Sequence, residues 1–175
     1  MPSIVKHSPY VGVSSCLLGE MVRYDGSHKS NRTVKELAAE GLHFIPFCPE
    51  VEIGLGVPRE PIQLVQTAAG TRCLGTKTKT LDVTESLNNL ATQQRWADSL
   101  SGYIFKARSP SCGLSDVPIL RGRNRANNGQ GLFAARIKQT YPALPIADEN
   151  QLENLEFRQD FIVRIQVYHQ QQFGV

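Results

Sequence analysis

Short apolar runs alternate along the chain with segments that have the apolar spacing of a helix. The apolar runs, which have the length of buried strands, lie at residues 10–15, 44–47, 103–107 and 144–147. Helical spacing occurs at residues 33–40, 84–100, 132–140 and 150–172, the last within a C-terminal segment 149–175. This alternation predicts an α/β fold in three layers, with a mostly parallel sheet flanked by helices.

Two segments depart from the alternation. Residues 62–83 carry two β-prone pieces, 63–66 and 71–74, which indicate a hairpin or an irregular excursion. Residues 121–131 are basic and rich in small side chains, which is typical of a loop. We find no internal repeat, low-complexity tract or domain boundary, so the sequence predicts a single domain over residues 1–175.

Composition limits the classes of function. Of the 175 residues 41% are hydrophobic and 20% are charged, as in a soluble globular protein. The net charge of +3 is too small to indicate nucleic acid as a partner, and Arg121, Arg123 and Arg125 are most simply a solvated face. The N-terminus has no secretory signal pattern, and no run reaches the ~18 apolar residues of a membrane span. We therefore expect a cytoplasmic protein without a membrane partner.

Three of the four cysteines share a position relative to the apolar runs. Cys16, Cys48 and Cys112 each follow one of them closely, whereas Cys73 lies in the predicted hairpin. The carboxyl ends of parallel strands meet at one edge of a sheet, where ligand sites collect. We expect the first three thiols to converge there, and we interpret Cys73 as structural or incidental.

A converged set of three thiols has several interpretations, and the spacing leaves them open. Ordinary core cysteines are one. A structural zinc site would require a fourth ligand, for which the candidates are Cys73, His7, His28, His43 and His169. A nucleophilic cysteine would require a base. An iron–sulfur cluster is normally bound by four thiolates, so three would leave one iron open.

Three sequence motifs around these cysteines resemble the thiouracil desulfidase family, long catalogued as a bacterial domain of unknown function. They lie in the family's order within residues 14–113, and they read SSCLLGEMVRYDG (14–26), PFCPEVEIGL (46–55) and KARSPSCG (106–113). The resemblance implies a single-domain α/β fold with a [4Fe-4S] cluster on Cys16, Cys48 and Cys112.

The resemblance also implies a reaction. One iron is open to the sulfur of a thiolated pyrimidine such as 2-thiouracil, and C=S becomes C=O with release of sulfide and no net redox change. This is C–S cleavage of the hydrolase or lyase type. A soft thiocarbonyl sulfur suits an iron that carries thiolate ligands.

The motifs also suggest roles for three polar residues. Glu50 is the candidate general acid/base, Ser109 the candidate for positioning the pyrimidine or water, and Ser111 a further substrate-binding candidate. The simpler alternatives are a carboxylate that caps a turn and a turn serine before Pro110. Two other functions remain in view, namely a zinc-binding module without catalysis and a metal-free hydrolase that uses Cys16.

Overall fold

The computed structural model describes residues 8–78, 80–93 and 95–174. Its centre is a parallel four-stranded sheet, sheet A, with the strand order β2-β1-β5-β8. The strands are β1 (Tyr10–Ser14), β2 (His43–Phe47), β5 (Gly102–Phe105) and β8 (Ile146–Asp148). The α/β prediction is confirmed, and Pro46 lies in an edge strand, where a missing N–H is tolerated.

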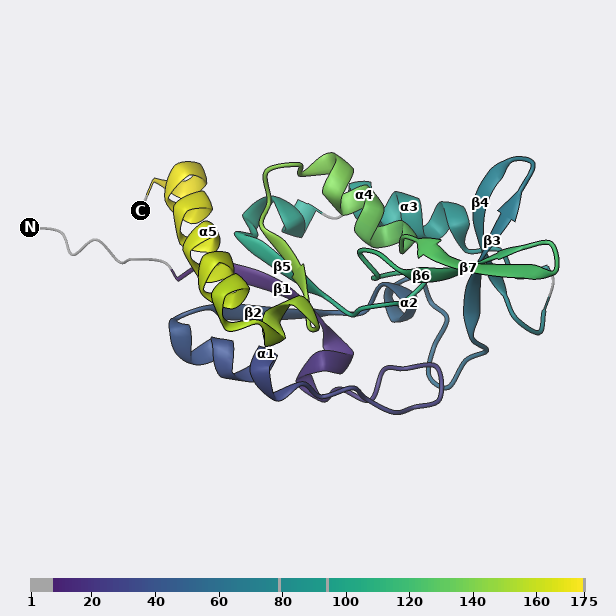
Figure 1. Cartoon of the computed structure of the whole chain (residues 1–175), viewed down its shortest axis with the longest axis horizontal. Helices are drawn as coiled ribbons and strands as arrows, with labels where there is room; N and C mark the ends of the chain where they lie inside the picture. Colours follow the sequence, from purple (N-terminus) through teal and green to yellow (C-terminus); the bar gives the residue numbers. More distant parts are fainter. Residues whose placement is uncertain (1–7, 79, 94, 175) are drawn as a thin grey trace, which may run out of the picture.

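Helices cover both faces of sheet A (Figure 1), which gives the three predicted layers. One face carries α1 (Arg32–Glu36) and α5 (Leu155–Phe173). The other carries α3 (Thr84–Gln93) and α4 (Leu132–Thr140). A short helix, α2 (Pro49–Glu52), follows β2 directly.

A hydrophobic core lies on each face of sheet A, because successive side chains of a strand point to opposite faces. In β5, Ile104 packs with Phe161 of α5, while Tyr103 and Phe105 pack with Phe133 of α4. Tyr103 and Phe105 stack with ring centroids 4.0 Å apart. Sheet A is therefore fixed from both sides, and its carboxyl edge is a rigid support for a site.

A second sheet, sheet B, was only half predicted. Its strand order is β4-β3-β6-β7, with β3 (Ile62–Thr67), β4 (Gly70–Gly75), β6 (Val117–Arg121) and β7 (Asn124–Gly129). The hairpin of β3 and β4 is confirmed. The loop predicted over 121–131 is wrong, because most of it belongs to the antiparallel pair β6 and β7.

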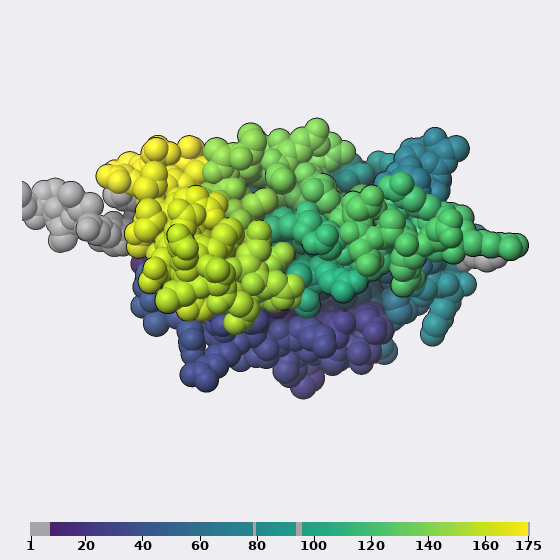
Figure 2. Space-filling model, viewed as in Figure 1, coloured from purple at the N-terminus to yellow at the C-terminus, as the bar shows by residue number. Residues whose placement is uncertain are grey.

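The error has a physical cause. The side chains of β7 are mostly exposed and polar, so no apolar alternation marks the strand. Its pairing is set by β6, which itself pairs with β3 through Ile119 and Leu120. Figure 2 shows this hairpin projecting from the end of the molecule opposite the C-terminus.

Several predicted helix limits also change. The helix predicted over 84–100 ends at Gln93, and a 3₁₀ segment covers Arg95–Ser99. A 3₁₀ segment, Leu37–Glu40, likewise completes the helix predicted at 33–40. The C-terminal helix begins at Leu155, not at 149 or 150, because Asn154 caps it by accepting the Phe157 N–H. No helix among the described residues has the length and apolar character needed to span a membrane.

Candidate functional site

Three thiols line one pocket at the carboxyl edge of sheet A. Cys16 lies in the 3₁₀ turn Ser15–Leu18 after β1, Cys48 follows β2, and Cys112 lies in the loop after β5. The pocket has a volume of about 330 Å³, within the range of small-molecule sites. The structure therefore brings together the three cysteines that the sequence singles out.

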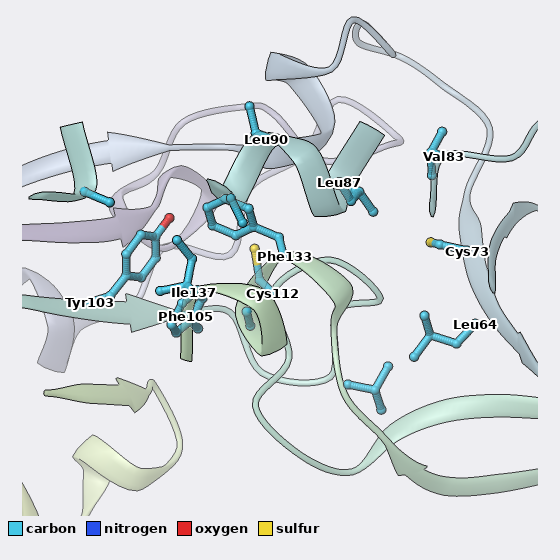
Figure 3. Close-up of a cluster of buried hydrophobic side chains, with 14 of the residues drawn as sticks. Leu64, Cys73, Val83, Leu87, Leu90, Tyr103, Phe105, Cys112, Phe133 and Ile137 are labelled. Carbon is cyan, nitrogen blue, oxygen red and sulfur yellow. The ribbon is translucent and has the colours of Figure 1, made fainter. Parts of the chain in front are cut away.

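The fourth cysteine is elsewhere. Cys73 is fully buried in β4, and Figure 3 shows it beside Leu64 and Val83, apart from Cys112. Within the described part of the chain, the pocket lining includes neither Cys73 nor a histidine, and His7 lies outside that part. The pocket thus offers three thiols without a fourth cysteine or histidine ligand from the described residues.

Local structure places Glu50 next to Cys48. Pro49 occupies the first turn of α2, where its fixed φ and missing N–H are favourable, and Cys48 is the N-cap residue. The Glu52 N–H donates to the Cys48 carbonyl at 3.0 Å, which closes the turn. As a result Glu50 and Cys48 both line the pocket.

The loop that carries Cys112 is held by a serine and two glycines. Ser109 Oγ accepts the N–H groups of Ser111 at 3.2 Å and Cys112 at 3.0 Å, and the Ser109 carbonyl accepts the Gly113 N–H at 2.8 Å. A Cβ on Gly131 would lie 2.6 Å from the Cys112 backbone nitrogen. Ser109 therefore fills the turn role that the sequence offered as its simpler alternative, and Gly131 allows α4 to begin against the loop.

A hydrogen-bonded chain joins the three predicted polar residues. Ser111 Oγ donates to Glu50 Oε1 at 2.8 Å, and the oxygens of Ser109 and Ser111 are 3.0 Å apart. An ionised carboxylate only accepts, so Ser111 gives its single hydroxyl proton to Glu50. The Ser109 hydroxyl is therefore the donor in the contact with Ser111. Arg59 Nε donates to the other oxygen, Glu50 Oε2, at 2.9 Å, and the Arg59 and Glu50 side chains are 6% and 13% exposed. The Glu50 carboxylate is therefore held at both oxygens.

A second ion pair involves Lys106, which also lines the pocket. The Lys106 ammonium pairs with Glu149 Oε1, and Glu149 Oε2 accepts the Ala107 N–H at 2.7 Å. Lys106 follows β5 and Glu149 follows β8, so this pair joins the ends of two neighbouring strands.

The pocket is rich in positive charge. Among the described residues, the lining contains one carboxylate, Glu50, and five basic side chains: Arg23, Lys29, Arg59, Lys106 and Arg108. The lining also includes Arg59 and Pro61, from the segment that leads into sheet B, and Ile62, the first residue of β3.

Burial raises the pKa values of the three pocket thiols. It raises the pKa of Cys16 to about 11, against the opposing effect of Lys106, and it also raises the pKa values of Cys48 and Cys112. Thiols in such surroundings are poor nucleophiles near neutral pH. A bound metal deprotonates its thiol ligands outright, so these groups suit metal binding better than covalent catalysis.

Three thiols are a donor set that an iron–sulfur cluster can use. Within residues 8–78, 80–93 and 95–174, no three His, Cys, Asp or Glu side chains are grouped closely enough for one metal ion. Soft thiolates are the donors that iron–sulfur clusters require.

The fold and the three-thiol pocket define the class of protein, an α/β domain with a ligand site at the carboxyl edge of a parallel sheet. The family model for 2-thiouracil desulfurase matches residues 11–149, and the chain belongs to this family. The resemblance drawn from the three motifs is thereby confirmed, and thiouracil desulfuration is supported as the general function.

Two known proteins are similar over most of the chain. The Bacillus subtilis (strain 168) protein YbbK, described as uncharacterized, is 31% identical over a 151-residue alignment, and the match covers 82% of this chain and 97% of YbbK. A solved structure of the [4Fe-4S]-dependent thiouracil desulfidase TudS is 31% identical, with a TM-score of 0.65. That match covers 87% of this chain and 98% of the TudS chain.

Sequence reasoning missed three charged residues of the site. Glu149 lies two residues after the predicted strand 144–147, so the strand-end argument that found the cysteines would have found it. Lys106 belongs to the third motif but received no role. Arg59 lies in an irregular Gly/Pro-rich segment, and no local pattern marks it as the partner of Glu50.

Proposed function

We propose that this protein removes sulfur from a thiolated pyrimidine such as 2-thiouracil. Water adds to the carbon that carries the sulfur, the C–S bond breaks, and C=S plus H₂O gives C=O plus H₂S without net oxidation or reduction. The observation that carries the proposal is one pocket that combines three thiols with the Glu50–Ser111–Ser109 hydrogen-bonded chain.

Cys16, Cys48 and Cys112 would hold a [4Fe-4S] cluster. When bound, the cluster supplies a soft Lewis acid for the thiocarbonyl sulfur at the iron that lacks a cysteine ligand. The lining supports this assignment because it presents three thiols, while Cys73 is packed into sheet B. All four cysteines are free thiols, which suits a reducing compartment such as the cytoplasm.

Glu50 is the proposed general base and later general acid. Its carboxylate takes a proton from the attacking water and returns it to the departing sulfur. Arg59 and Ser111 fix both carboxylate oxygens, so the group is oriented before substrate arrives. Ser111 also lines the pocket beside Cys112, which places its hydroxyl where it can bind the pyrimidine, with Ser109 behind it as donor.

The proposal is tested by anaerobic reconstitution followed by a sulfide-release assay with 2-thiouracil. Wild-type protein should bind about four irons per chain and release sulfide. Cys112→Ser should lose most of the iron and all detectable turnover. Cys73→Ala is the matched control, because it removes an equally buried thiol outside the pocket, and its iron content should stay at the wild-type value.

The two other functions predict different results. A structural zinc module predicts a colourless protein that contains zinc and releases no sulfide. A hydrolase based on Cys16 alone predicts full turnover after chelation of all metal. Either result would overturn the proposed function.

A further inference from the structure

Lys106 is held in place through its backbone N–H and through its side-chain ammonium. The Lys106 N–H donates to Ser14 Oγ at 2.9 Å, which joins the end of β5 to the end of β1. The Lys106 ammonium donates to the Ala107 carbonyl at 2.9 Å and pairs with Glu149. An ammonium has three donors, so these two contacts leave one for a group in the pocket that Lys106 lines.

Glu149 is a buried carboxylate, and its burial requires a partner that compensates its charge. The residue is only 7% exposed, and a carboxylate is costly to bury unless it is paired. One oxygen binds the Lys106 ammonium, and the other accepts the Ala107 N–H. Lys106 and Ala107 are the first two residues of the segment that leads from β5 to Cys112. One carboxylate thus fixes both a cation and the start of the cysteine loop.

The position of this cation matters because of the charge around it. Lys106 shares the pocket lining with Cys16, Cys48 and Cys112. Three thiolates in one pocket carry concentrated negative charge, and a departing sulfur adds to it. A preorganised cation in a partly buried site stabilises such charge more than a mobile surface lysine does.

We propose that Lys106 is a further residue of the desulfuration site, a fixed cation that offsets the negative charge of the thiolates and of the departing sulfur, and that Glu149 is the positioning residue that holds it there. The inference rests on the proposed function, since it concerns the same pocket.

The charge of Lys106 is tested by the reduction potential of the reconstituted protein. Lys106→Met removes the cation and keeps most of the aliphatic stem, so the potential should shift to a more negative value. Lys106→Arg should stay close to wild type, and so should Lys138→Met, an exposed lysine of α4 outside this pocket. A wild-type potential in loaded Lys106→Met would overturn the proposal.

Loss of iron uptake is also informative. If Lys106→Met fails to bind iron and Lys106→Arg binds it normally, the requirement for a cation at this position is supported. Failure of both variants to bind iron would contradict a role based on charge.

The positioning role of Glu149 is tested by a double-mutant cycle on kcat with 2-thiouracil. Lys106→Met should lower kcat by about tenfold or more with little change in KM. Glu149→Gln keeps an acceptor for the Ala107 N–H and should lower kcat in the wild-type background but hardly at all in Lys106→Met. Equal losses in both backgrounds would show that Glu149 does not act through Lys106.

The two proposals fail in different ways. Wild-type protein that is loaded with iron yet releases no sulfide would overturn the proposed function. The reduction potentials of the Lys106 variants would still decide whether this residue is a fixed cation of the thiol pocket.

Discussion

Glu50 shows how much a single residue depends on its partners in this site. An isolated carboxylate on the first turn of a four-residue helix would be an exposed cap. Arg59 and Ser111 instead bind its two oxygens, and all three residues line the thiol pocket. The contacts therefore distinguish a candidate base from a surface group.

Glu50→Gln tests this role directly. The amide keeps the size of the side chain but cannot take a proton, so kcat should fall by about 10²- to 10⁴-fold. Iron content should stay at the wild-type value, because Glu50 is not a proposed ligand. Iron analysis and sulfide release measure the two quantities.

Glu52→Gln is the control, since Glu52 lies on the same short helix, is exposed and does not line the pocket. It should leave kcat within about twofold of wild type, as expected for a surface change. Wild-type turnover in Glu50→Gln would remove Glu50 from the mechanism.

At the residue scale, the sequence predicted those groups whose position follows from the end of a strand. Cys16, Cys48 and Cys112 were found in this way, and Glu149 could have been. Arg59 could not, because its contact with Glu50 depends on the path of an irregular segment through space. The pairing of Ser111 with Glu50 joins residues 61 positions apart and was equally hidden.

Among the elements, the approach of α4 to the cysteine loop is the most demanding contact. Gly131 precedes α4, and its backbone lies against that of Ser111, Cys112 and Gly113. Its φ of −61° is one that any residue adopts, so space alone excludes a side chain here.

Gly131→Ala should therefore displace backbone at the site. We expect a loss of about 1–3 kcal/mol in the free energy of unfolding, as for overpacked cores, together with weaker iron uptake. Urea unfolding and iron titration measure these effects. Gln130→Ala, at the exposed neighbouring residue, should change neither, and unchanged iron uptake in Gly131→Ala would show that the loop tolerates the displacement.

The elements that were mispredicted share a cause. The strand β7 has no apolar alternation, because its pairing with β6 and not burial makes it a strand. The helix predicted over 84–100 was too long, because the 3₁₀ segment at Arg95–Ser99 also buries an apolar residue, Ala97, and so extends the apolar pattern of the helix. Periodicity reports burial, and it misses elements that are defined by backbone pairing or by a change in helix type.

For the whole molecule, the C-terminal helix is part of the fold although the family match ends at residue 149. Helix α5 supplies Phe161 and Ile165, both fully buried, to the core that includes Val11, Val13 and Ile104. One face of sheet A therefore depends on α5 for its cover.

Phe161→Ala measures this dependence. Truncation of a fully buried phenylalanine should cost about 3–5 kcal/mol of unfolding free energy, and the single predicted domain should still unfold in one cooperative transition. Val163→Ala, on the same helix and 54% exposed in the wild type, should cost less than about 0.5 kcal/mol.

Chemical denaturation followed by both fluorescence and circular dichroism gives the two values. A small loss in Phe161→Ala, or separate transitions for the two probes, would contradict a single cooperative unit that includes α5.

The pocket lining is built from two parts of the fold, so the cysteines and the rest of the lining can change independently in sequence. The thiols come from the ends of strands in sheet A, while Arg59, Pro61 and Ile62 come from the segment that enters sheet B. Substitutions at these three positions would change part of the pocket lining without changing the three cysteines. Substrate preference could thus change over evolution while the three cysteines stay at the carboxyl edge of sheet A.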